Sequence, residues 1–280
     1  ELPEVEVVKK SLHKQISNTY IRNIVINNIN LRYKLNTKAF KSIIGSKILS
    51  VKRRSKYLFI NLQNKYSILV HLGMTGKFFF KDKKKIISKL SFYYSTDDHL
   101  KKHDHLIITL SNKSILIYND IRRFGFIKIV KSNDIQKNFH IKDLGPEPLS
   151  NKFNTKYFKS YILNRNISIK SLLMSQKFIS GLGNIYVNEI LYLSYIDPFR
   201  DVKLLRDNEI KKIIKNKKKI LKKAVIYGGS SIRNFNGIEG NSGNFQSNFK
   251  VYSREGLKCK KKGCYNTIIK KIISKRSTFF

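Results

Sequence analysis

The chain has 280 residues, 41% of them hydrophobic and 12% aromatic, so it can bury one large or two ordinary cores and is not a disordered basic tail. Its 57 Lys and Arg residues outnumber 18 Asp and Glu residues, and the net charge of +39 favours nucleic acid over a membrane surface as partner. Without a run of 18 apolar residues or an apolar signal core, and with only two cysteines, we expect a cytoplasmic protein.

The first half of the chain combines one helix with many short strands. Pro3 suits a first helical turn, and apolar residues at helical spacing then predict a helix over residues 3–16: Val5, Val8, Leu12 and Ile16. From about residue 23 to 130, segments such as KYLFINL and HLIITLSNKSILIY are short, β-branched or aromatic, and separated by polar turns. This pattern predicts an antiparallel sandwich or barrel, in which residues 81–103 form a polar loop or excursion between two strands.

The pattern changes at KDLGPEPLS, where glycine and prolines interrupt both periodicities and indicate a domain boundary. Downstream, apolar residues at helical spacing opposite a lysine face predict a helix in the segment that begins at residue 207. A stretch rich in Gly, Asn and Ser follows residue 228 and predicts a mobile loop. The final 32 residues are expected to form strands around a cysteine turn.

Two turns carry residues that suit contacts with nucleic acid. HLGMTG places Met74, and NDIRRFGF places Arg122 and Phe124, in turns next to glycine. Taken singly, a methionine is more often core filler, and two arginines more often mark an ordinary basic hairpin. Together, an apolar wedge and an arginine are what a protein needs to fill a duplex from which a base has been turned out.

Three further motifs allow more than one interpretation. KHDH places His103 and His105 on the same side of a strand, where polar surface contacts are favoured over metal binding. GLGN, residues 181–184, opens a helix whose N–H groups can seat a phosphate. Cys259 and Cys264 have a spacing that zinc hairpins use, but all six histidines lie at or before His140, so only half of a four-ligand site is present.

These motifs occur in one order along the whole chain: ELPEVE, RRSKYL, HLGMTG, KHDH, DIRRFG, LGPEPL, GLGNIYVNE and CKKKGC…KRSTFF. The series resembles the formamidopyrimidine-DNA glycosylases, bacterial enzymes that excise oxidised purines. The resemblance implies an α+β fold of two domains. It divides the chain into a β-sandwich catalytic domain over 1–132, a linker over 133–152, a helix–two-turn–helix domain over 153–245 with a lesion-capping loop over 229–247, and a zinc-finger-like hairpin over 246–280.

The resemblance also implies an activity and its residues. It implies a monomer that binds duplex DNA, removes 8-oxoguanine and formamidopyrimidines and cleaves the abasic site by β,δ-elimination. An amino-terminal proline attacks C1′ in the family. The implied catalytic residues are Glu1, Glu4, Lys56 and Arg276. The implied DNA-binding residues are His71, Met74, His103, Arg122, Phe124, Arg165, Asn184 and Tyr252, and the implied zinc ligands are Cys259 and Cys264.

The sequence departs from the family pattern at both ends. The nucleophilic proline does not precede Glu1, and a second cysteine pair does not follow the STFF segment. We therefore expect a longer natural protein, in which Met-Pro precedes Glu1 and the added cysteines complete one structural zinc site. Three alternatives remain open: an endonuclease VIII-like enzyme for oxidised pyrimidines, an inactive relative that binds lesion DNA, and, remotely, a basic RNA-binding protein.

Overall fold

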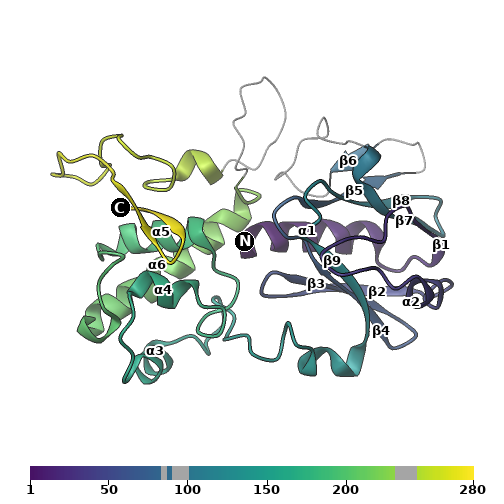
Figure 1. Ribbon diagram of the computed structural model, residues 1–280, viewed down its shortest axis with the longest axis horizontal. Helices are drawn as coiled ribbons and strands as arrows, with labels where there is room; N and C mark the ends of the chain where they lie inside the picture. Colours follow the sequence, from purple (N-terminus) through teal and green to yellow (C-terminus); the bar gives the residue numbers. More distant parts are fainter. Residues whose placement is uncertain (83–86, 90–100, 231–244) are drawn as a thin grey trace. The chain divides into compact units, whose positions relative to one another are not determined.

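The computed structural model describes the chain except for residues 83–86, 90–100 and 231–244 (Figure 1). The chain divides into two compact units. The sandwich unit contains Pro3–Lys142 and the stretch that begins at Gly228, and the helical unit contains Glu1–Leu2, Asp143–Tyr227 and Phe245–Phe280. None of the described helices combines the length and the apolar character that a membrane span requires.

Two antiparallel sheets form the sandwich unit. One sheet has five strands in the order β1 (Ile21–Ile26), β7 (Asp104–Leu110), β8 (Ile115–Asp120), β5 (Gly76–Lys81) and β6 (Ile87–Lys89). The other has four strands in the order β2 (Ile48–Arg54), β3 (Tyr57–Leu62), β4 (Tyr66–His71) and β9 (Phe126–Lys131). The central strands bury runs of consecutive residues, such as four in β4 and five in β5, and the two sheets are antiparallel, so the predicted sandwich is confirmed.

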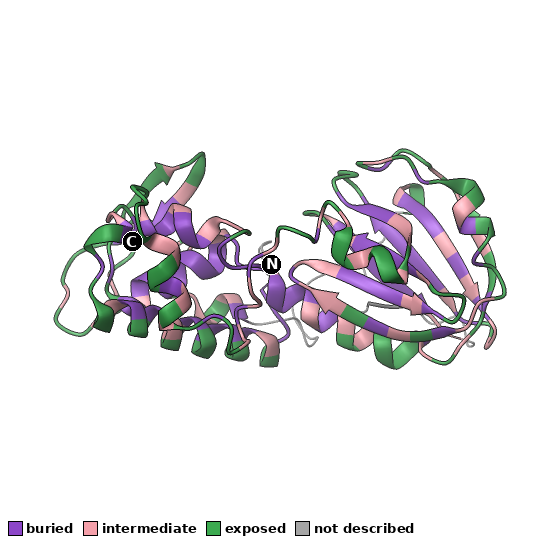
Figure 2. Ribbon diagram, turned by 90° about the horizontal axis from the view of Figure 1, so that it is seen from below, coloured by how far each residue is buried: buried purple, intermediate pink, exposed green. Residues whose placement is uncertain are grey.

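The core of the sandwich unit combines side chains of both sheets with the leading helix α1 (Leu2–Ile16). The four apolar residues that predicted this helix are all buried in that core, and in Figure 2 the strands of this unit show buried stretches in purple beside intermediate and exposed ones. Among the described residues the unit also contains the short elements α2 (Thr37–Lys41), η1 (Lys101–His103) and η2 (Ser132–Lys137).

The segment 81–103, for which the sequence predicted no strand, contains the short strand β6 (Ile87–Lys89). Strand β6 pairs with β5 in register, with Phe79 opposite Lys89 and Lys81 opposite Ile87. A strand of three residues is too short to give a period-2 signal in the sequence, which is why it was missed. The same segment ends in the short helix η1 (Lys101–His103), and its residues 83–86 and 90–100 lie outside the described residues.

The helical unit is built around helix α5 (Asn184–Ser194), almost all of whose side chains are buried. Helix α6 (Asp207–Ile226) packs along α5, and both contribute to one apolar core. The other described helical elements of the unit are α3 (Thr155–Ile162), α4 (Ile169–Met174), η3 (Val202–Leu204) and η4 (Phe245–Asn248). The predicted helix that begins at residue 207 is therefore confirmed.

The end of the chain is a β-hairpin of β10 (Lys270–Ile273) and β11 (Arg276–Phe279). Its turn consists of Ser274 and Lys275, both in the left-handed region with φ of 48° and 61°. The two cysteines precede this hairpin, in a turn closed by an isolated bridge between Lys258 and Thr267. The sequence predicted strands on both sides of the cysteine turn, whereas both strands follow it and only a single bridge closes it.

The buried face of α6 contains one charged residue that the apolar pattern did not indicate. Lys217 is 3% exposed, and its Nζ lies 4.4 Å from the ring centroid of Phe153. Burial, and secondarily the neighbouring charge of Lys218, lowers the pKa of Lys217 from 10.5 to about 8. Burying the charged form costs free energy that the ring contact only partly offsets.

Lys217→Met is therefore expected to stabilise the protein by about 2 kcal/mol at pH 7. The unfolded chain binds this proton more tightly than the folded chain, so the wild-type penalty is fully present below pH 8. It is relieved as the pH rises from about 8 to 10.5, and the gain from the substitution should shrink over that interval. Urea unfolding at several pH values measures this effect, and exposed Lys218→Met is the matched control, for which little change is expected.

Candidate functional site

Glu1 is fixed at the start of helix α5. Its Oε1 accepts a hydrogen bond from the backbone N–H of Ile185 (2.8 Å), and Oε2 accepts one from Tyr186 (3.4 Å). A Cβ on Gly183 would lie 2.4 Å from Cδ of Glu1, so only glycine permits this approach. Helix N-termini favour negative charge, because their first N–H groups have no partner within the helix. The N–H groups of the helix that the GLGN segment opens, predicted to bind a phosphate, thus bind the carboxylate of Glu1.

Arg276 is presented by a hairpin that is anchored to the same helix. The Nδ2 of Asn184 donates to the carbonyl of Ser277 (2.9 Å). The Nζ of Lys170 donates to the same carbonyl (2.8 Å) and to Oγ1 of Thr278 (2.7 Å). Burial, and then the charge of Arg276, lowers the pKa of Lys170 to about 8. Lys170 and Arg276 also line a cavity of about 220 Å³, so two cationic side chains face one space.

Tyr252 belongs to the same group of residues. A buried carboxylate, Glu189, accepts the backbone N–H groups of Lys250, Val251 and Tyr252 at 2.9–3.0 Å and thereby shapes this loop. Burial raises the pKa of Tyr252, a hydrogen bond with Asn184 lowers it, and the charge of Glu1 raises it. Glu1, Asn184, Tyr252 and Arg276 are therefore brought together within the helical unit.

Arg165 is not part of that group in the described residues. It follows helix α3, where its Nε donates to the carbonyl of Tyr161 (2.6 Å). Its guanidinium carbon lies 4.2 Å from the ring centroid of the same tyrosine. Its role in DNA binding stays a prediction.

Glu4 is buried in the sandwich unit, on helix α1. Its Oε1 accepts hydrogen bonds from the backbone N–H and the hydroxyl of Ser230, both at 2.9 Å. Gly229 approaches the same side chain with φ of +83°, and a Cβ there would lie 3.0 Å from Cγ of Glu4. The first residues of the predicted capping loop are thus fastened to a predicted catalytic acid, whereas its residues 231–244 lie outside the described part.

Lys56 and His71 lie at adjacent ends of paired strands. Lys56 occupies the turn between β2 and β3, and the next residue, Tyr57, is opposite His71 on β4. Burial, and then the charges of Lys56 and Arg32, lowers the pKa of His71 to about 4. The ring is therefore neutral at pH 7. Its Nδ1 accepts the N–H of Gly73 (3.2 Å), so the proton resides on Nε2, which can donate to a phosphate.

Met74, Arg122 and Phe124 form one exposed cluster, which we call the wedge. Strand β4 pairs with β9 and β5 pairs with β8, so the loops that connect β4 to β5 and β8 to β9 are neighbours. The guanidinium of Arg122 donates to Sδ of Met74 (3.4 Å) and lies 4.5 Å from the ring centroid of Phe124. Met74 is 58% exposed and Phe124 48%, which rules out the interpretation of Met74 as core filler.

The expectation that His103 and His105 share one side of a strand is wrong. His103 ends the turn η1, and His105 is buried on β7, where the backbone has a register shift. The Nε2 of His105 donates to the carbonyl of Asp120 (2.8 Å), so this ring serves the fold. His103 remains the candidate for a DNA contact.

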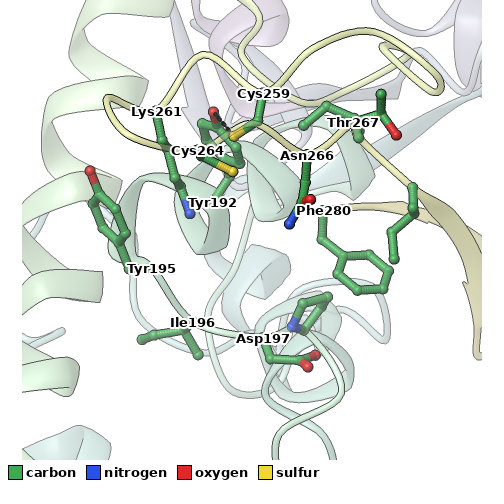
Figure 3. Close-up of a pocket in the computed structure, with 13 residues that line it drawn as sticks. Tyr192, Tyr195, Ile196, Asp197, Cys259, Lys261, Cys264, Asn266, Thr267 and Phe280 are labelled. Atoms are coloured by element: carbon green, nitrogen blue, oxygen red, sulfur yellow. Dashed lines mark hydrogen bonds between the residues drawn. The ribbon is translucent and has the colours of Figure 1, made fainter.

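Cys259 and Cys264 line a pocket of about 510 Å³ beside Tyr192 and Lys261 (Figure 3). The Sγ of Cys259 lies 3.2 Å from the hydroxyl of Tyr192. Partial burial raises the pKa of the Cys259 thiol, but hydrogen bonds with Tyr192, the Lys261 backbone and Cys264 more than offset this and lower it. Cysteine thiolates are typical zinc ligands, but the described residues bring no third His, Cys, Asp or Glu to these two.

Two residues that shape the site were missed from the sequence. Lys170 is 1% exposed, and Glu189 is 3% exposed. In the sequence, a lysine at the start of a short helix and a glutamate within an apolar helix resemble ordinary surface positions. Only the three-dimensional contacts show that both side chains are buried under the loops they hold.

Comparisons with known proteins identify the family to which this chain is similar. Models of the formamidopyrimidine-DNA glycosylase N-terminal domain and H2TH domain match residues 1–127 and 144–236. Formamidopyrimidine-DNA glycosylases of Rickettsia canadensis and Rickettsia felis are 40% and 42% identical over 280 residues, which is all of this chain and 97% and 96% of theirs. Structures of Lactococcus lactis Fpg with DNA containing an abasic site or Fapy-dG superpose with a TM-score of 0.85, at 32% and 31% identity, covering 100% of this chain and 97% of theirs. The chain therefore belongs to the formamidopyrimidine-DNA glycosylase family.

Proposed function

We propose that this protein excises oxidised purines, namely formamidopyrimidines and 8-oxoguanine, from duplex DNA and then cleaves the abasic site. The enzyme is a bifunctional glycosylase and abasic-site lyase. The observation that carries the proposal is the position of Glu1, whose carboxylate is held by the first N–H groups of α5 rather than free in solvent. The net charge of +39 supports a polyanionic substrate, and because that substrate is chromosomal DNA we place the protein in the bacterial cytoplasm.

We assign the covalent steps as follows. An amine beside Glu1 adds to C1′ of the damaged nucleoside while the bond from C1′ to the base nitrogen breaks. Glu1 supplies a proton as the base leaves, and Glu4 is the second acid of the site. Glu1 then takes the proton that the added amine loses and passes it to the ring oxygen O4′, so that the C1′–O4′ bond breaks and an iminium link to the opened sugar forms. This iminium acidifies the C2′ proton, whose removal, assisted by Lys56, expels the 3′ phosphate. Arg276 holds a phosphate and assists the second elimination.

We assign the remaining residues to DNA binding. We assign phosphate contacts to His71, Asn184 and Tyr252, with His71 as a neutral donor, and further DNA contacts to His103 and Arg165. The wedge occupies the space that the everted nucleotide leaves, because an exposed apolar tip beside a guanidinium can stack in the gap and bond to the unpaired base.

We also propose that Cys259 and Cys264 supply two of the four ligands of a structural zinc ion. Zinc would fix the turn that precedes the hairpin of Arg276, and no catalytic step depends on it. Zinc content measured by mass spectrometry should fall in Cys259→Ser and remain unchanged in the control Ser253→Ala. Equal zinc content in all proteins would contradict this assignment.

Borohydride trapping tests the enzymatic proposal. The chain as printed and the same chain with a proline placed before Glu1 are each incubated with a duplex that contains 8-oxoguanine opposite cytosine. The proline-bearing chain should form a covalent adduct, and the printed chain should form far less. Absence of any adduct, together with tight binding to an abasic-site analogue, would instead support the inactive lesion-binding relative.

A further inference from the structure

A buried carboxylate lies between the two loops that carry the wedge. Asp120, the last residue of β8, is 0% exposed. Its Oδ1 accepts the hydroxyl of Thr75 (2.5 Å), from the loop of Met74. Its Oδ2 accepts the backbone N–H of Gly125 (2.8 Å), from the loop of Phe124. One side chain therefore binds both loops at once, and both bonds are buried, where the low local dielectric strengthens a hydrogen bond.

Thr75 extends this connection to the arginine of the wedge. Its Oγ1 accepts the backbone N–H of Arg122 (3.1 Å) while its hydroxyl proton is donated to Asp120. The chain of bonds therefore runs from Arg122 through Thr75 to the carboxylate. It fixes the backbone on either side of the wedge without contacting any of its three exposed side chains.

The surrounding geometry leaves the two loops little freedom. A Cβ on Gly73 would lie 2.6 Å from the N of Gly125, and a Cβ on Gly125 would lie 2.8 Å from the carbonyl oxygen of His71. The buried hydroxyl of Tyr118 also donates to Oδ2 of Asp120 (3.3 Å), and burial raises the pKa of this tyrosine well above 10, so that it remains a donor. The backbones of the loops are thus in contact, with Asp120 as their shared acceptor.

We propose that Asp120, acting through Thr75 and Gly125, is a positioning residue that holds the two wedge loops as one rigid body. This inference rests on the proposed function, which assigns the wedge to the gap in the duplex. A preformed wedge enters that gap without losing loop entropy on binding, whereas separate loops would lose it. The Asp120 network should therefore determine how strongly the protein prefers a duplex with a gap over an intact one, while phosphate contacts determine its affinity for both.

The test compares two dissociation constants of the full chain by fluorescence anisotropy. One duplex contains a tetrahydrofuran abasic-site analogue opposite cytosine, and the other is undamaged. Asp120→Asn and Thr75→Val, which keep side-chain shape, should each lower the preference for the gapped duplex, by about tenfold for Asp120→Asn. Affinity for undamaged DNA should stay within about twofold. Thr75→Ser, which restores the hydroxyl, should recover the preference.

Ser67→Ala is the matched control, because it removes a buried hydroxyl from the opposite end of β4, where Ser67 bonds to Asn61 and Ser132. It should leave both constants unchanged. A wild-type preference that survives Asp120→Asn and Thr75→Val overturns the inference. An equal loss of affinity for both duplexes also overturns the inference, because that result is expected if Asp120 and Thr75 only stabilise the fold. A wild-type protein with no preference at all would contradict the proposed function itself.

Discussion

Glu1→Gln is expected to reduce the excision of 8-oxoguanine by at least roughly 100-fold, in the chain that carries a proline before Glu1. The substituted amide retains an oxygen that can accept the N–H of Ile185, so the side chain can keep its place at the start of α5. It cannot, however, supply a proton to the leaving base. Single-turnover release of the base from a duplex measures the loss, and affinity for an abasic-site duplex should change by less than about threefold.

Two comparisons separate this chemical role from a structural one. Cleavage of a duplex that already contains an abasic site should fall much less, because the base has departed before the enzyme acts. Gly183→Ala should lower base excision by about tenfold with the carboxylate intact, because the added Cβ would lie 2.4 Å from Cδ of Glu1 and displace it. Unchanged excision in Glu1→Gln would remove the central assignment.

The features of the fold that depend on periodicity could be predicted from the sequence. Apolar residues at helical spacing indicated α1 and α6, and short β-branched segments indicated the sandwich. The segment around β6 was missed because three residues carry no period. Lys217 was missed for a related reason: a lysine on the apolar face of a lysine-rich helix looks like a displaced surface residue, and only its burial against Phe153 identifies it.

The site could be predicted only as a set of residue types. HLGMTG and RRFG indicated a wedge, and the structure brings Met74, Arg122 and Phe124 into contact. What the sequence could not show is how each group is held, because buried partners such as Lys170 and Asp120 are distant in sequence or look like surface residues. His71 is an example of the consequence. Its neutrality at pH 7 follows from burial and nearby cations, neither of which its sequence neighbours reveal.

Arg276→Gln is expected to weaken binding to lesion-containing duplex by about tenfold and to lower the slope of log Kd against log salt concentration by about one. Arg276 is exposed at the edge of its hairpin and carries a permanent charge, so its phosphate contact releases a counterion. Binding measured between 50 and 200 mM salt gives the slope. Lys275→Gln, at the adjacent turn position, is the matched control. Lys275 is also exposed but is assigned no phosphate contact, so its substitution should change the slope less.

His71→Gln should behave differently, although it removes a contact to the same polyanion. With a pKa of about 4 the imidazole is uncharged from pH 6 to 8, so it binds phosphate as a neutral donor and releases no counterion. We expect affinity to fall a few-fold at every salt concentration with the slope unchanged, and wild-type affinity to show no titration of this group between pH 6 and 8. A slope lowered by about one in His71→Gln would show that the ring is protonated in the complex. The phosphate would then have raised a pKa that burial, Lys56 and Arg32 together hold down in the free protein.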